Sequence, residues 1–148
     1  MAELNDNQHK LVRDQMARAG RRLDGAAAAA SRKKVTEGEF DNNFDGVVTA
    51  IFHVVEAVEI ARYGRMRAFG EGEESTVIRA VHAELVAAGV PEVPPVSRLI
   101  DLNARRNTSI HGHWTEVLDR DGLETAITAA RSLWRAATVY LKARGIDA

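Results

Sequence analysis

The chain has no cysteine and few aromatic or proline residues. Without cysteine it can form no disulfide, and thiolate catalysis and thiolate metal ligation are excluded. It also has no apolar run near the roughly 20 residues of a membrane span. Its first residues lack the basic and apolar regions of a signal peptide. We therefore expect a cytoplasmic protein without a membrane partner, because chains free of disulfides suit that compartment.

An excess of charge of either sign is also missing. The 20 lysines and arginines are matched by 21 aspartates and glutamates, for a formal net charge of −1. No global attraction to nucleic acid follows from this balance, so any such site must be a local patch. The candidate contributors are Arg98, Arg105 and Arg106. At 148 residues, the chain is long enough for a single domain, 1–148, with its own core.

The chain contains helical periodicity and no strong β alternation. Apolar residues recur four and three apart, which predicts amphipathic helices. The second and most hydrophobic of these is expected to be the central helix. Gly20 and Gly25 predict a weak point or break in the first. The expected helices cover about residues 3–34, 37–63, 76–88, 98–111 and 123–144.

Helix-terminus signals divide these segments. Thr36, Ser75 and Ser97 are predicted N-caps, and Gly89 and Gly145 are predicted stops. The expected fold is therefore all-α, an antiparallel helical bundle of about five helices, or of four helices with additional turns.

Chemistry is concentrated in one short stretch, Arg106-Asn107-x-x-x-His111, near the end of the fourth helix. Asn107 and His111 are four residues apart and share one face of an ideal helix. The Asn107 side-chain carbonyl can then accept a hydrogen bond from one ring nitrogen of His111 and leave the other free. Arg106 lies about 140° round the helix from His111. A frayed helix end or a second copy of the chain would bring the two side chains together. Arg105 and His113 permit shifted pairings.

An arginine with an oriented imidazole indicates an anionic substrate and acid–base chemistry. Cleavage of RNA fits, because its 2′-hydroxyl supplies the nucleophile and no metal or other cofactor is required. Arg106 would offset charge on the phosphate and His111 would move a proton. Cyclisation needs both a base and an acid, and one chain offers one strong histidine candidate. A homodimer is favoured, because two copies of the chain would supply two such histidines.

A structural interpretation is equally consistent with these residue types. Arg106 would be a solvated side chain and His111 a cap on the helix carbonyls. On the second helix, Glu56 and Glu59 would either brace the motif arginine or form a surface ladder of ion pairs. Nothing in the histidine and glutamate spacing requires a metal site.

The motif and the helical pattern around it resemble the HEPN superfamily (higher eukaryotes and prokaryotes nucleotide-binding domain). Its ribonuclease members carry arginine, a polar residue that is often asparagine, a few variable residues and histidine, here Arg106, Asn107 and His111. The resemblance covers most of the chain as a helix pattern and these six residues as a motif. It implies an all-α bundle, a homodimer with both motifs at its interface, and metal-independent endoribonuclease activity in a toxin or antiviral role.

The resemblance also suggests weaker assignments and leaves alternatives. Arg98, Arg105 and His113 would contact the RNA, and Glu56 would support the site. An antitoxin protein is a further expected partner, although His113 stands where many antitoxin-paired HEPN toxins have tyrosine. One alternative is a non-catalytic HEPN-like domain that binds nucleotide or RNA or acts as a dimeric scaffold. Another is a helical partner protein without a site at the motif.

Overall fold

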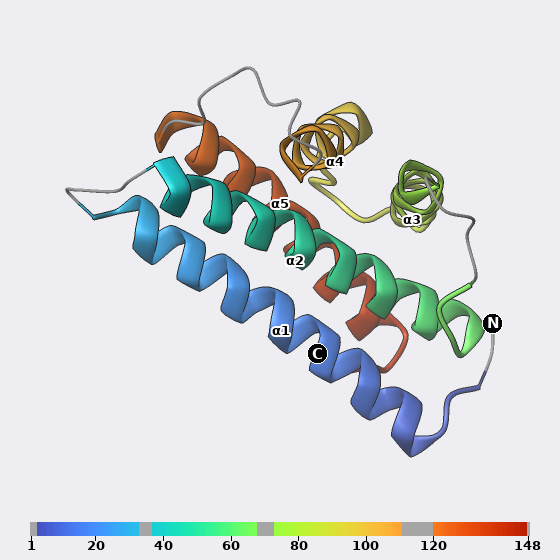
Figure 1. The fold of residues 1–148 in the computed structure, drawn as a ribbon. Helices are drawn as coiled ribbons and strands as arrows, with labels where there is room; N and C mark the ends of the chain where they lie inside the picture. The colour runs from blue at the N-terminus through green and yellow to red at the C-terminus, as the bar shows by residue number, and fades with distance from the viewer. Residues whose placement is uncertain (1–2, 33–36, 68–72, 111–119, 148) are drawn as a thin grey trace.

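The computed structural model describes residues 3–32, 37–67, 73–110 and 120–147. Within these ranges the chain forms five α-helices and no strand, so the predicted all-α helical bundle is confirmed (Figure 1). The helices are α1 (Asp6–Ala30), α2 (Glu37–Tyr63), α3 (Glu74–Ala87), α4 (Val96–Ile110) and α5 (Arg120–Ala143).

Three long helices form one body, and the two short helices cover one side of it (Figure 1). α1 runs antiparallel to α2, because the Gln8 side chain near its start donates to the carbonyl of Gly64 just beyond the end of α2. α1 is also antiparallel to α5, whose Trp134 Nε1 donates to the carbonyl of Met16 at 2.9 Å. α2 and α5 therefore run in the same direction. α3 and α4 pack against α2 and α5, and no contact of either with α1 is found among the residues that the structure describes.

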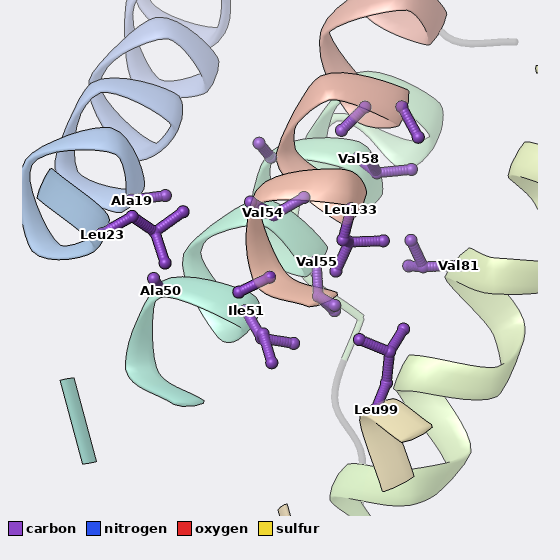
Figure 2. Close-up of a cluster of buried hydrophobic side chains, with 14 of the residues drawn as sticks. Ala19, Leu23, Ala50, Ile51, Val54, Val55, Val58, Val81, Leu99 and Leu133 are labelled. Carbon is purple, nitrogen blue, oxygen red and sulfur yellow. The ribbon is translucent and has the colours of Figure 1, made fainter. Parts of the chain in front are cut away.

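The core lies around α2, which is buried on most of its circumference. Ala19 and Leu23 of α1 face Ala50 of α2, and Leu133 of α5 lies beside Val55 (Figure 2). Val81 of α3 and Leu99 of α4 point into the same apolar cluster from the other side. The strong apolar character of residues 37–63 follows from this position, because a helix covered by four others needs few polar positions.

Gly20 and Gly25 do not interrupt α1, contrary to the expectation of a weak point there. Gly20 lies against the indole of Trp134, and a Cβ added there would be 3.8 Å from the ring, in ordinary van der Waals contact. The first helix is kept continuous by packing against a neighbour, which outweighs the lower helix propensity of glycine.

The helix ends agree only partly with the predicted caps. Ser75 and Ser97 lie inside the first turns of α3 and α4, so both were wrong as N-caps. Gly89 and Gly145 follow helix ends with φ of 76° and 77°, in the left-handed region where glycine is favoured, and both predicted stops are confirmed. α1 begins with a capping box between Asn5 and Gln8.

No helix among the described residues combines the length and apolar character needed to cross a membrane.

Candidate functional site

α4 carries the candidate motif. The helix includes Arg106 and Asn107 and ends at Ile110, so the motif begins near its C-terminal end as predicted. His111 follows the last residue of the helix, and both His111 and His113 lie outside the described residues. The predicted hydrogen bond between Asn107 and His111 therefore stays a prediction.

The other two arginines suggested for RNA binding belong to α4 as well. Arg98 is exposed in its first turn, and Arg105 is half-buried. They are seven residues apart, which places them on the same side of the helix, separated by about 10 Å along its axis. Asp101 is also exposed and lies between them in sequence. The arginines of α4 thus form a short row that leads toward the motif.

Asn103, which the sequence reasoning did not single out, lies one helical turn before Arg106. It is only 6% exposed, and its side-chain oxygen has no hydrogen-bond partner among the described residues. A buried amide is costly unless its polar atoms are paired. The sequence signal is its place in the apolar stripe of α4, four residues after the buried Leu99.

Glu59 is not part of a surface ladder of ion pairs, and its suggested contact with the motif arginine stays a prediction because the side chain of Arg106 is not described. Its carboxylate is fully buried and accepts hydrogen bonds from Nε and Nη2 of Arg67 at 2.8 and 3.1 Å. The guanidinium of Arg67 also lies 4.1 Å from the centre of the Tyr63 ring. The bond to Glu59, followed by its negative charge, raises the pKa of Arg67. This pair fixes the chain after α2, and the Glu59 carboxylate is already occupied.

Glu56 is half-buried on α2 and makes no ion pair with the described residues. The suggestion that it supports the motif arginine stays a prediction, since the side chain of Arg106 is not described.

A second carboxylate, which is half-buried, joins three helices. Glu84 of α3 accepts from the hydroxyl of Tyr140 at 2.8 Å and from Arg144 at 3.0 Å, and it pairs with Arg62 of α2 at 3.2 Å. Burial and the bond to Glu84 raise the pKa of Tyr140 to about 12. Every charge in this cluster has an opposite partner, which indicates a structural role at the meeting point of α2, α3 and α5.

The remaining histidines of α2 and α3 have separate environments. His82 is half-buried, with Nε2 2.9 Å from the carbonyl oxygen of Pro94. His53 is half-buried on α2. In the part of the chain that the structure describes, no three histidine, cysteine, aspartate or glutamate side chains are grouped closely enough to hold a metal ion.

Comparisons with family models, curated proteins and solved structures gave no match to this chain.

Proposed function

We propose that this protein is a metal-independent endoribonuclease of HEPN type, which cleaves RNA at a composite site in a homodimer. The observation that supports the proposal most directly is the position of α4. This helix runs through Arg106 and Asn107 and ends at Ile110, one residue before His111. Near a helix end, fraying or a second copy of the chain would bring Arg106 and His111 together, although an ideal helix separates them by about 140°.

The proposed chemistry assigns one task to each motif residue. Arg106 binds the scissile phosphate and stabilises the charge that develops on its oxygens. His111 transfers the proton, and Asn107 holds the imidazole in one tautomer. The 2′-hydroxyl attacks the adjacent phosphorus, the bond from phosphorus to the 5′-oxygen breaks, and that oxygen takes a proton. The products are a 2′,3′-cyclic phosphate and a 5′-hydroxyl end.

The homodimer supplies the second proton-transfer group. One His111 acts as the base for the 2′-hydroxyl, and His111 of the second copy acts as the acid for the leaving oxygen. Arg98, Arg105 and His113 would contact the flanking RNA. In this scheme the protein is a cytoplasmic toxin or antiviral effector, with an antitoxin protein as a further partner.

Cleavage of a mixed RNA substrate in EDTA tests the reaction. Wild type, His111→Ala and His9→Ala are compared, the last as a control because His9 is half-buried on α1, which does not contact α4. Wild type and His9→Ala should both cleave RNA and leave cyclic phosphate ends, whereas His111→Ala should be inactive. Equal activity of the His111 and His9 variants would contradict the assignment.

Mixing wild type with His111→Ala tests the dimer. If each site needs both copies of His111, an equal mixture after subunit exchange retains about one quarter of the activity of the same total amount of wild type. Sites that need one histidine each would retain about half. Loss of activity without loss of RNA binding in His111→Ala would also separate catalysis from the alternative of a non-catalytic binding domain.

A further inference from the structure

Two arginines that form no ion pair with the described residues lie on α1, next to the helix α2 that carries a half-buried histidine. Arg18 and Arg22 are exposed and four residues apart on α1, so they are neighbours on one side of the helix. Each is two residues from Gly20, and is therefore about 160° round α1 from the position that packs against Trp134 of α5. The two arginines thus lie on the side of α1 that faces away from α5.

His53 of α2 completes this group. Burial is the main cause that lowers its pKa, and the positive charges of Arg22 and then Arg18 lower it further. The packing of the two helices agrees with this, because α1 runs antiparallel to α2, and Ala19 and Leu23 of α1 face Ala50 of α2 (Figure 2). His53 follows Ala50 by about one turn, so it lies at the level of α1 that carries the two arginines. Arg18, Arg22 and His53 are called the α1–α2 basic patch below.

The acidic groups near the patch do not neutralise it. Asp14 precedes Arg18 by four residues on α1, and Glu56 follows His53 by three on α2. Both spacings allow a contact along a helix. Neither acid forms an ion pair with the patch, and neither arginine is ion-paired to any described residue. The patch contrasts with Arg62, Arg67 and Arg144, which all have carboxylate partners.

We propose that the α1–α2 basic patch binds the phosphodiester backbone of single-stranded RNA as a contact separate from the cleavage motif. Two guanidinium groups match the charge and geometry of phosphate oxygens. The imidazole of His53 can donate a third hydrogen bond once a phosphate lies beside it, because the negative charge favours its protonated form. The described residues of α1 and α4 do not contact each other, so the patch would hold a part of the RNA at a distance from α4.

This inference rests on the proposed function for the identity of the anion, and its test does not depend on cleavage. The probe is a labelled 2′-O-methyl oligonucleotide of roughly 12 residues, within the length range that single-strand binding sites cover. It lacks the 2′-hydroxyl nucleophile and stays intact. Binding is followed by fluorescence anisotropy in EDTA over a series of salt concentrations, using wild type, Arg18→Gln/Arg22→Gln and the control Arg79→Gln/Arg135→Gln.

The control removes the same formal charge from exposed positions on α3 and α5. We expect Arg18→Gln/Arg22→Gln to weaken binding at least tenfold, since a hydrogen bond to a charged group is worth about one such factor or more. The slope of log affinity against log salt should fall by about 0.7 to 1.4, for one or two lost phosphate contacts. The control should bind within about twofold of wild type and keep its slope.

Three results would overturn the patch: no binding by wild type, equal binding by wild type and Arg18→Gln/Arg22→Gln, or an equal loss in both double variants. Selective loss in Arg18→Gln/Arg22→Gln, with no cleavage of ordinary RNA by wild type, would support the patch and refute the ribonuclease. Cleavage that depends on His111, together with oligonucleotide binding that is unchanged in Arg18→Gln/Arg22→Gln, would support the ribonuclease and refute the patch. An NMR titration of His53 tests binding at the patch itself, because bound oligonucleotide should raise the pKa of this histidine.

Discussion

Replacing Arg67 by methionine would leave the Glu59 carboxylate buried without its partner. Glu59 is fully buried, and both of its oxygens accept hydrogen bonds from Arg67. Removing one member of a buried ion pair typically costs about 3–5 kcal/mol. The side chain of Arg67 is 36% exposed, so water can enter where it was and offset part of the loss. We therefore expect the free energy of unfolding to fall by about 2–3 kcal/mol at pH 7.

The loss should depend on pH in a defined direction. In Arg67→Met, the charged carboxylate of Glu59 would be buried without a positive partner, and binding of a proton would relieve that cost. In mildly acidic solution the folded state of the variant should therefore bind more protons than the unfolded state, so the stability of the variant falls as pH rises toward 7. The difference between wild type and variant should be small at pH 4 and largest near pH 7.

Urea denaturation followed by circular dichroism at 222 nm measures this difference at each pH. Arg65→Met is the matched control, because Arg65 is exposed two residues earlier and its loss should change stability by less than about 0.5 kcal/mol. Adding Glu59→Gln to Arg67→Met should recover much of the lost stability and remove the pH dependence. Equal stability of the Arg67 and Arg65 variants, or a loss that is the same at pH 4 and pH 7, would refute the reasoning.

Three further changes test other parts of the structure. Leu133→Ala should reduce the free energy of unfolding in urea by about 3 kcal/mol, because Leu133 is buried where α5 meets α2 and the short helices; a loss below 1 kcal/mol would contradict that packing. Gly89→Ala should lower it by about 1–2 kcal/mol, because φ is 76° there; no change would argue against the left-handed conformation. Arg18→Gln/Arg22→Gln should raise the pKa of His53 in an NMR titration, because two positive charges that disfavour the imidazolium are removed; an unchanged pKa would place the arginines too far away.

The sequence predicted the helices well because each has an apolar stripe that must be buried. Val12, Met16, Ala19 and Leu23 recur at helical spacing and are all in the core. Cap positions were less predictable. Ser75 and Ser97 are good N-cap residues by type, yet α3 begins at Glu74 and α4 at Val96. The path of the chain into each helix depends on tertiary packing, and this outweighs the small energy of a single cap.

The partners of charged residues were the least predictable part. Glu59 and Arg62 have the spacing of a helical ion pair, but the structure pairs Glu59 with Arg67 and Arg62 with Glu84. Sequence spacing describes one helix, whereas these partners are set by the orientation of α2 against α3 and by the chain that follows α2. The first two residues of the motif, Arg106 and Asn107, could be placed near the end of a helix from sequence alone. The α1–α2 basic patch could not, because it needs the packing of α1 on α2.

The hydrogen bonds of Arg120 could not be predicted from sequence spacing either. Its guanidinium donates to the carbonyls of Ala30 and Arg32, so the first residue of α5 satisfies groups at the end of α1.

The parallel course of α2 and α5 has a consequence for how the chain folds. α1 and α2 are neighbours in sequence and can form a hairpin early, but the hydrogen bond from Trp134 to Met16 spans 118 residues. During synthesis α2 therefore exists for some time with much of its apolar surface uncovered by α5. Contacts of such long range form slowly, because the loop between them must close first. We expect intermediates that lack docked α5 to be the species most prone to aggregation and proteolysis.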